Sequence, residues 1–594
     1  MKRRGIALVT ALAIMALAAV LAFGAFFSTQ IEQWVTRNEV TATQAYYAAH
    51  AGLQKYKTAL FQNFRWALSN VTPTTLTAEA CENILAGGIY WNRNLSGSPA
   101  SFPMTFTETF PNGSRATVTI SKVKIPQGEG VPAKESSIAL LIESRGEYGT
   151  AKAQVQAMVI LTDASQWDYA LFTGKGYGGK IAGNSKIHGG VYIEGDPSKQ
   201  LPPSEPVLQL TGNTGIVNTY DLSNYSNVLS RPKVGNLCAS LRVRYGWVIM
   251  EGSSSLGTKE APLVSVAVGS PNANAGSNAK DLPLIYRCSG QSRNYNNCNL
   301  TDKADIYTLG KAGRFDLSTP PSFPVLGSDN CANPTSWRCK IREEAAGKGL
   351  MVTYGIPPAI TLPAGAAWNN PDDPSKPPSS CQTALASNTP LSLGNTAIDC
   401  TYTLGGVNPA GGFRYTPGTG NNPGTLEVYG TVDLIGYNLE IAKSINYRAY
   451  GFSQIGYGAS IVVERAGNTG GDIQIKDYLR PDASLRKFPD QVLGLVAERN
   501  ILQWKNTEVF ASLYAGNEYR MSEKGGGGQT MLVGNVITDR FCVSGANKMN
   551  ETTCVPGGSA DLYFVDTSTN RPASLAKMTS DQKPTYQIVM YERR

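Results

Sequence analysis

The N-terminal segment is the feature that most constrains the fold of this chain. Lys2, Arg3 and Arg4 precede an uncharged, almost wholly apolar run of 23 residues from Gly5 to Phe27. As a helix rising ~1.5 Å per residue, this run would measure about 34 Å, enough to cross a bilayer core of ~30 Å. Basic residues before such a run keep its start in the cytoplasm, so we expect the remainder of the chain to be exported.

The apolar pattern continues past the membrane-spanning run. Residues recur at steps of three, four or seven and keep one face of a helix apolar. They are Ile31, Val35, Ala42, Ala45, Ala49, Leu53, Tyr56, Leu60, Phe64 and Leu68. The first proline is Pro73. The sequence therefore predicts a single helix over residues 6–70, transmembrane to about residue 27 and ending against a globular head.

These residues resemble the N-terminus of type IV pilins, particularly large minor pilins of the PilX and type II secretion K-subunit kind. The resemblance lies in Arg4 to Val9 (RGIALV) and in Ala45 to Leu53 (AYYAAHAGL). It implies that a membrane-embedded prepilin peptidase removes the leader, residues 1–5, by cutting between Gly5 and Ile6. It also implies N-methylation of Ile6, an inner-membrane precursor, and partners among the other pilins of one fibre.

Thr10 departs from the family pattern. Its position, the fifth of the mature chain, usually carries Glu, which compensates the terminal ammonium inside the apolar fibre. The resemblance implies that members lacking this Glu are tip or initiating subunits, so Thr10 points to a special role in pilus assembly. The alternative is that Thr10 packs as an ordinary small residue of a membrane helix.

The fold class we expect is α+β: the pilin helix, a small antiparallel sheet and a large all-β insertion. Alternating residues and turns predict six head strands: Met104–Phe110, Ala116–Val123, Ile138–Glu143, Ala153–Leu161, Leu562–Val565 and Tyr586–Tyr591. The simplest topology places all six in one sheet. The head would then comprise residues 71–162 and 559–594, with residues 163–558 inserted between them.

Repeats within the insertion favour a β-solenoid with rungs of about 20 residues. The pattern G-N-[S/T]-x-I occurs at residues 183–187, 212–216 and 394–398, with a looser copy from Gly467. Apolar triplets stand at 495–497, 513–515 and 532–534. Gly and Asn suit corners of positive φ, and the apolar residues would fill the stack. An irregular β-sandwich with coincidental turns is the alternative.

The ten cysteines fit an exported protein stabilised by disulfides. Sequence neighbours suggest the pairs Cys288–Cys298, Cys331–Cys339, Cys381–Cys400 and Cys542–Cys554, which leaves Cys81 and Cys238. No C-x-x-C spacing occurs, which argues against zinc or thioredoxin-like chemistry.

The chain offers little for catalysis, so we expect no enzyme, cofactor or metal. It has only two histidines, His50 and His188. The glycine run Gly525–Gly528 lacks the Gly-Lys-Ser/Thr of a phosphate-binding loop. The acidic pairs Glu343–Glu344 and Asp372–Asp373 are typical of solvated charges on loops.

Ligand binding is the function class that remains, and nucleic acid is the first candidate ligand. The net charge is +8, of which the leader cations contribute +3 and leave +5, so any polyanion site must depend on local patches. Aromatic and basic residues alternate in three places, where cations could hold phosphates and rings could stack on bases. The candidates are Arg242, Arg244 and Trp247; Arg287; and Trp337, Arg338, Lys340 and Arg342. Ordinary exposed surface is the alternative for each cluster.

The whole pattern is similar to large competence minor pilins of thermophilic bacteria. That resemblance implies a pilus-tip subunit at the cell surface that binds double-stranded DNA without sequence preference. A tip adhesin for glycans or surfaces, and the tip subunit of a type II secretion pseudopilus, remain alternatives.

The processing prediction can be checked with one substitution. Gly5→Leu places a bulky side chain at the peptidase cut, so we expect the precursor to remain membrane-bound and uncut. N-terminal sequencing of the wild-type protein should begin at Ile6, whereas the variant should retain its leader. A mature wild-type chain that begins at Met1 would contradict the pilin interpretation.

Overall fold

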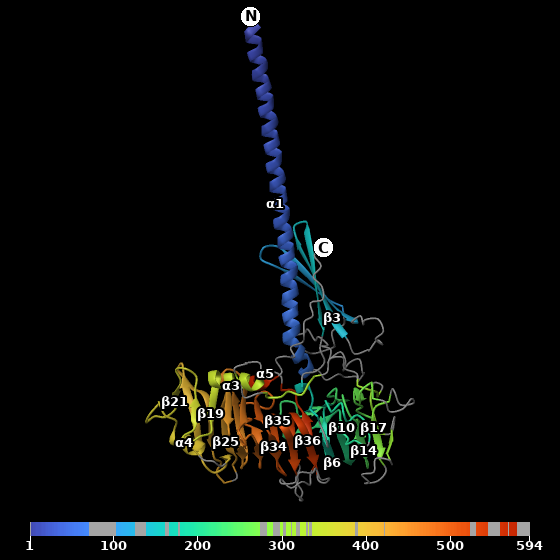
Figure 1. The fold of residues 1–594 in the computed structure, drawn as a ribbon, viewed down its shortest axis with the longest axis vertical. Coiled ribbons are helices and arrows are strands. Elements are labelled where there is room, and N and C mark those ends of the chain that lie inside the picture. The colour runs from blue at the N-terminus through green and yellow to red at the C-terminus, as the bar shows by residue number, and fades with distance from the viewer. Residues whose placement is uncertain are drawn as a thin grey trace. The chain divides into compact units, whose positions relative to one another are not determined.

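The computed structural model describes residues 2–70, 103–124, 138–160, 166–175, 179–202, 204–273, 282–288, 298–300, 305–309, 312–315, 321–327, 331, 336–386, 390–420, 422–522, 530–544, 559–567 and 570–578. The chain forms two compact units (Figure 1). The pilin unit contains the N-terminal helix and a four-stranded sheet. The body contains every described strand from Leu171 onward.

The helix α1 runs without a break over Lys2–Asn70, which confirms the prediction of one long N-terminal helix. It is long and apolar enough to cross a membrane. Its apolar side chains from Leu8 to Val40 are exposed within the chain, whereas Ala45, Ala49 and Leu53 are almost fully buried. The helix therefore changes from an unpartnered apolar rod to the packed core of the pilin unit near residue 45.

The sheet of the pilin unit is antiparallel, in the order β1-β2-β3-β4. Its strands are β1 (Met104–Thr109), β2 (Arg115–Lys124), β3 (Ile138–Tyr148) and β4 (Ala151–Ile160). The four predicted strands before residue 162 are all present. Leu53 and Tyr56 of α1 pack against Val118, Ile120 and Ile142.

Two glycines let α1 approach this sheet closely. A Cβ on Gly146 of β3 would stand 1.9 Å from the carbonyl oxygen of Ala45 in α1. A Cβ on Gly52 of α1 would stand 2.8 Å from the Cβ of Ala116 in β2. The backbones of helix and sheet therefore approach each other more closely than side chains at these positions would permit.

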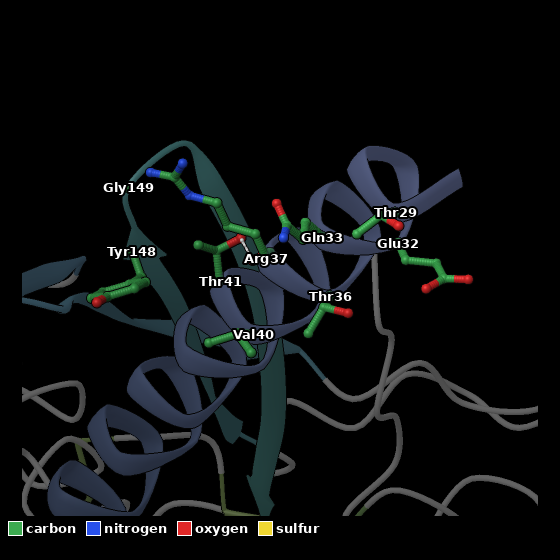
Figure 2. A pocket seen from close by; sticks show the side chains of 9 residues that line it. All are labelled: Thr29, Glu32, Gln33, Thr36, Arg37, Val40, Thr41, Tyr148 and Gly149. Carbon is green, nitrogen blue, oxygen red and sulfur yellow. Dashed lines mark hydrogen bonds between the residues drawn. The ribbon is translucent and has the colours of Figure 1, made fainter. Parts of the chain in front are cut away.

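A groove of about 890 Å³ lies between α1 and the β3–β4 turn (Figure 2). It is lined by Thr29, Glu32, Gln33, Thr36, Arg37, Val40, Thr41, Tyr148 and Gly149. The side chain of Arg37 extends toward the turn at Gly149. This lining offers a surface for contacts rather than an enclosed reaction site.

The prediction that late strands complete the pilin sheet is wrong for the first of them. β37 (Ala560–Phe564) pairs in parallel with strands of the body, not with β1–β4. Leu562 is fully buried in the body core, which explains its apolar pattern equally well. The predicted strand Tyr586–Tyr591 lies outside the described residues.

The body consists of three rows of parallel strands. Row A is β19 (Gly349–Thr353), β26 (Thr431–Ile435), β29 (Gly458–Ala466), β33 (Val492–Ala497), β35 (Glu508–Ser522), β36 (Thr530–Ser544), β5 (Leu171–Thr173), β8 (Val191–Ile193), β13 (Ser240–Val243) and β16 (Ser265–Val268). Row B is β22 (Leu391–Leu393), β27 (Leu439–Ile441), β31 (Ile473–Ile475), β34 (Asn500–Gln503), β35, β36, β6 (Gly179–Gly183), β9 (Leu208–Gly212), β14 (Val248–Glu251) and β17 (Ile285–Cys288). Row C is β25 (Gly424–Tyr429), β28 (Ile445–Tyr450), β32 (Leu479–Pro481), β35, β36, β37, β7 (Lys186–His188), β10 (Gly215–Val217) and β15 (Ser255–Leu256).

Two separate stretches of chain build this stack. One half runs from β5 to β17, and the other runs from β19 to β37. They join where β36 pairs with β5 and β6, and where β37 pairs with β7. The first and last strands of the body, β5 and β37, therefore lie in the same part of the stack, each paired with β36, as an inserted domain requires. The insertion itself, with its boundaries at residues 163 and 558, stays a prediction.

The repeats that suggested a solenoid are only partly placed as expected. Ile187 and Ile216, from the first two G-N-[S/T]-x-I copies, pair directly, and Gly183 and Gly212 have positive φ. Leu256, the next partner in this row, belongs to no copy. The Gly394 copy lies between β22 and β23 (Ile398–Leu404), outside this row.

The predicted 20-residue rung is wrong. Leu495 pairs with Leu513, 18 residues later, but Val191 pairs with Leu241, 50 residues later. Leu513 in turn pairs with Val536 and not with the predicted Leu532. A long helix with a strand-rich body is confirmed, while the β-solenoid remains our interpretation of three parallel rows with uneven rungs.

A ladder of polar side chains stacks the turns between rows A and B. The Asp472 backbone N–H donates to Asn438 Oδ1 at 2.9 Å, and Asn500 Nδ2 donates to Asp472 Oδ1 at 2.9 Å. Asn517 Nδ2 then donates to Asn500 Oδ1 at 2.7 Å, and Arg540 Nη2 to Asn517 Oδ1 at 2.6 Å. Side-chain ladders of this kind hold successive turns in register.

The outer side of row A is covered by segments from elsewhere in the body. The cover consists of residues 321–327, α3 (Trp337–Lys348) and α5 (Ala573–Met578), packed with Phe172, Tyr192 and Tyr514. The hydroxyl of Tyr192 donates to the Pro321 carbonyl at 3.0 Å, and that of Tyr514 to the Pro324 carbonyl at 2.7 Å. These contacts give the body a second apolar layer outside its central core.

Three of the predicted disulfides are present: Cys288–Cys298, Cys331–Cys339 and Cys381–Cys400. Cys542 and Cys238 are also disulfide-bonded. Cys554 and Cys81 lie outside the described residues, so their pairings stay predictions.

The close contact between α1 and β3 predicts the effect of a single methyl group. Gly146→Ala forces the backbones apart, and overpacking of this kind costs about 1–3 kcal/mol. We expect faster hydrogen exchange in β2 and β3 of the variant, measured by mass spectrometry. Gly235→Ala is the matched control, because a Cβ there meets no atom within 4 Å. Unchanged exchange in the Gly146 variant would contradict this account of the packing.

Candidate nucleic-acid interface

The first predicted cluster is divided between surface and core. Arg242 lies on β13, half-buried, with Nη1 donating to Ser240 Oγ at 3.1 Å. Arg244 lies 3.8 Å from Glu194 and over the Tyr245 ring, 4.8 Å from its centroid. Trp247 is fully buried, and its Nε1–H donates to Ser204 Oγ at 3.2 Å. The prediction of Trp247 as a stacking platform is therefore wrong, because no face of its ring reaches solvent.

The second predicted cluster is the helix α3 rather than an open aromatic–basic patch. Ser336 caps this helix by accepting from the Cys339 backbone N–H, and the Cys331–Cys339 disulfide ties its first turn. Trp337 packs against the apolar cover of row A, and Lys340 is half-buried. One face of α3 is therefore packed against row A.

Arg338 and Arg342 are used for anchoring α3. The Arg338 side chain is only 6% exposed, and its Nη2 lies 2.7 Å from Glu498 Oε1. Arg342 Nε donates to Glu464 Oε2 at 3.1 Å, and the Glu464 side chain is fully buried. The prediction of Arg338 as a DNA contact is wrong because its charge is buried and compensated. Removing one partner of such a buried pair typically costs ~3–5 kcal/mol.

A third carboxylate lies beneath α3 and lacks this compensation. Asp433, in the middle of β26, is fully buried, and neither of its carboxylate oxygens has a hydrogen-bond partner among the described residues. Burial, followed by the neighbouring Glu464 carboxylate, raises the pKa of Asp433 well above its ordinary value. We therefore expect Asp433 to be protonated over a pH range in which an exposed aspartate is ionised.

The cation of the third predicted cluster, Arg287, is also paired with groups of the body itself. Arg287 Nη1 lies 2.5 Å from Asp305 Oδ2, and Nη2 donates to the Gly252 carbonyl at 2.6 Å. The three clusters therefore do not form one site, and most of their charge serves contacts within the body.

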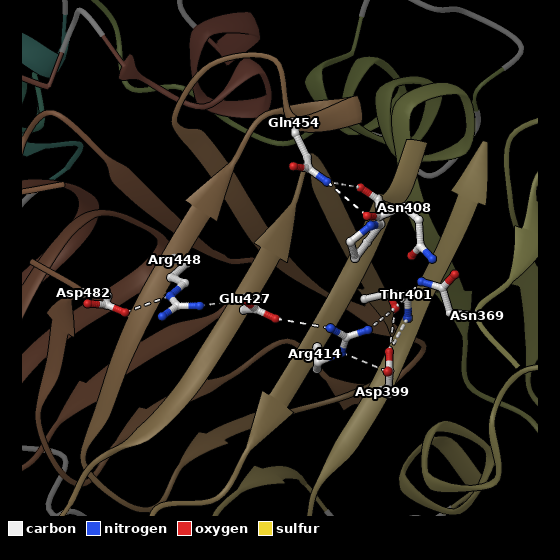
Figure 3. A network of polar contacts seen from close by, with 10 residues as sticks. Asn369, Asp399, Thr401, Asn408, Arg414, Glu427, Arg448, Gln454 and Asp482 are labelled. Carbon is white, nitrogen blue, oxygen red and sulfur yellow. Dashed lines mark hydrogen bonds and ion pairs between the residues drawn. The ribbon is translucent and has the colours of Figure 1, made fainter. Parts of the chain in front are cut away.

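A ladder of alternating charges runs from Asp399 on β23 and Arg414 on β24 (Val407–Thr416) into row C (Figure 3). Asp399 Oδ2 meets Arg414 Nε at 2.9 Å, and Arg414 Nη1 meets Glu427 Oε2 at 3.5 Å. Glu427 Oε1 then meets Arg448 Nη1 at 3.2 Å, and Arg448 Nε meets Asp482 Oδ2 at 2.7 Å. Strand register places opposite charges side by side, so this ladder neutralises itself and attracts no polyanion.

Cations at the two ends of the row B strands were missed at the sequence level. They are Lys443, Lys476 and Lys505 on one side, and Arg465, Arg499 and Arg540 on the other. Each stands alone in the sequence, and only the pairing of the strands brings them into lines. The signal that was available is a cation one or two residues after a short apolar strand, as for Lys443, Lys476, Arg499 and Lys505.

Comparison with solved structures gives a close match over nearly the whole chain. No family model and no curated protein sequence matches the chain. The crystal structure of the competence-associated pilin ComZ from Thermus thermophilus matches over 93% of this chain and 97% of that chain. The identity is 32% and the TM-score 0.63. The chain belongs to the ComZ family of pilins.

Membership in the ComZ family confirms the predicted competence-associated minor pilin. The apolar α1 fits a membrane-anchored precursor and a place on the pilus. The match is to a pilin, a structural protein. Within the described residues, no group of three histidine, cysteine or acidic side chains could hold a metal ion.

The buried Asp433 predicts a measurable pH dependence. Its folded-state pKa is raised, so its contribution to stability is present in full below the unfolded pKa and is lost as the pH rises through the folded pKa. Asp433→Asn keeps the group neutral, so the variant should melt higher than wild type at neutral pH, and the gap should close in acid. Calorimetry across a pH series measures this. A variant that melts lower than wild type at every pH would show that Asp433 is ionised and stabilising.

Proposed function

We propose that this ComZ-type pilin stands at the tip of a type IV pilus and binds extracellular double-stranded DNA for natural transformation. The observation that carries the proposal is the match to a competence-associated pilin over nearly the whole of both chains, pilin unit and body together. The body therefore belongs to the family and is not an addition peculiar to this chain. DNA is the substrate of natural transformation, which makes it the first ligand to test.

The tip position is supported by the size of the body and by Thr10. The body spans residues from 166 to 578, far more than the pilin unit contains. Pilins along a shaft pack side by side through helices only ~10–12 Å across, and repeated bodies of this size would collide there. Thr10 lacks the carboxylate with which a shaft subunit compensates the terminal ammonium of its neighbour.

Assembly with other pilins is supported by the exposed part of α1. Ile31, Trp34 and Val35 are 63%, 73% and 51% exposed, an apolar surface that soluble proteins seldom leave open. The groove beside Arg37 and Gly149 adjoins this surface. The prepilin peptidase and the inner membrane would be the earlier partners, before α1 enters the fibre.

Labelled DNA on piliated cells tests both parts of the proposal. Gold-labelled duplex fragments should gather at pilus ends on wild-type cells, and a strain lacking this chain should keep its pili but lose the label and its transformability. Label that persists in the deletion strain, or that is spread along the shafts, would overturn the proposal. Glycan-coated particles that gather at the pilus ends when DNA does not would favour the adhesin.

A further inference from the structure

Row B differs from the other two rows in what lies on its outer side. Row A is covered by α3, α5 and residues 321–327, and the middle of row C is covered by apolar residues around Tyr220 and Leu229. Toward β25 and β28, row C carries the self-neutralising charge ladder. The outward residues of β27, β31 and β34 are Glu440, Gln474 and Leu502, which are half-buried and belong to no apolar cluster. This part of row B therefore presents a polar strip to solvent.

One border of the strip is a line of lysines in the turns between rows B and C. Ile441, Ile475 and Gln503 are in register. Lys443 and Lys505 stand two residues after Ile441 and Gln503, where the middle rung carries Asp477, and Lys476 stands one residue after Ile475. The three lysines therefore lie in successive turns without sharing one register. Lys443 and Lys505 are exposed and form no ion pair with any described residue.

Lys476 in the same line is partly compensated. Its Nζ lies 2.6 Å from Glu440 Oε2 and 5.0 Å from the centre of the Trp504 ring. In the rungs on either side stand Lys443 and Lys505, which form no ion pair with a described residue, while Asp477 adds one negative charge to the middle rung. The line as a whole therefore keeps an excess of positive charge.

The other border is a line of arginines in the turns between rows A and B. The side chains of Arg465 and Arg499 are 49% and 43% exposed, whereas their partners Glu498 and Asp472 are 7% and 21% exposed. Arg540 is exposed, and its guanidinium donates to the neutral amide of Asn517. The cations thus face solvent while the carboxylates lie behind them, so an incoming anion meets the cations first.

The two lines have dimensions that suit a nucleic-acid backbone. Neighbouring rungs stand ~4.8 Å apart, so the three steps from the rung of Arg465 to that of Arg540 cover about 14 Å, and the four steps from the rung of Lys443 to that of Arg540 cover about 19 Å. At ~3.3 Å per residue, the six steps from Arg499 to Lys505 separate the lines by at most about 20 Å. A duplex carries one negative charge per ~1.7 Å of its axis, so a length of about 19 Å presents about eleven phosphates to six cations.

We propose that the strip of row B between these two lines, here called the row B face, is the surface that holds the phosphates of duplex DNA. This inference rests on the proposed function and names its site. The row B face places the phosphate contacts away from Trp247 and Arg338, which are buried. Because the cations meet phosphates and not base edges, binding through this face carries no sequence preference.

A triple substitution tests the row B face in the full-length protein. Lys443→Gln, Lys505→Gln and Arg540→Gln together remove three exposed cations that form no ion pair with described residues. Each phosphate contact contributes ~0.9 to the slope of log K against log salt, so we expect the slope to fall by up to about 2.7. The measurement is a duplex-DNA shift assay over a salt series, in detergent.

Two further variants serve as matched controls. Lys259→Gln, Lys348→Gln and Lys376→Gln remove the same charge from exposed positions off the row B face and should keep the wild-type slope. Lys443→Arg, Lys505→Arg and Arg540→Lys keep the charge in place and should also bind as wild type. Loss of binding in this charge-keeping variant would mean that the triple acts through folding, which overturns the argument from charge.

The outcomes separate this inference from the function on which it rests. If wild type shifts DNA and the two Gln triples lower the slope equally, the row B face is not the site, although the DNA-binding function stands. If wild type fails to shift duplex DNA even at low salt, the proposed function fails and the row B face fails with it.

Discussion

Backbone pairing along β36 is the interaction on which the rest of the body depends. This strand pairs with β35 on one side and with β5, β6 and β37 on the other. It thereby joins two halves that come from separate stretches of the chain. Its peptide groups are buried on both sides and must be hydrogen-bonded, so the halves cannot separate without exposing a row of unpaired donors and acceptors.

The register that this pairing imposes decides which charges remain available. Within strands, Arg414 and Arg448 stand directly beside Glu427 and are neutralised at contact distance. At the strand ends, the chain turns and side chains such as Lys443 and Lys505 project where no neighbouring strand opposes them. Whether a cation is free to bind a ligand therefore depends more on its position in the rung than on its neighbours in the sequence.

The features that could be predicted from the sequence were those written in local patterns. Helix α1 followed from periodic apolar residues, the β1–β2 hairpin from its turn, and three disulfides from nearby cysteines. Which turns stack on one another could not be predicted, because the separation of paired residues within one half ranges from 18, for Leu495 and Leu513, to 82, for Gly349 and Thr431. The site prediction failed for the same reason. The Trp337–Arg342 run is as polar as an exposed helix. Its arginines face inward only because they pair with Glu464 and Glu498, which lie more than 100 residues later in the chain. Asp433 did leave a local signal, a lone carboxylate between Val432 and Leu434 in an apolar strand.

The neighbouring positions of β5 and β36 have a consequence for how such bodies change over evolutionary time. The first and last strands of the body, β5 and β37, lie in the middle of the stack, whereas the strands farthest from the junction, β17 and β19, stand at its two ends. Rungs gained or lost at either end would leave the junction undisturbed. The family can therefore vary the length of its body in both directions while the anchoring pilin unit stays the same.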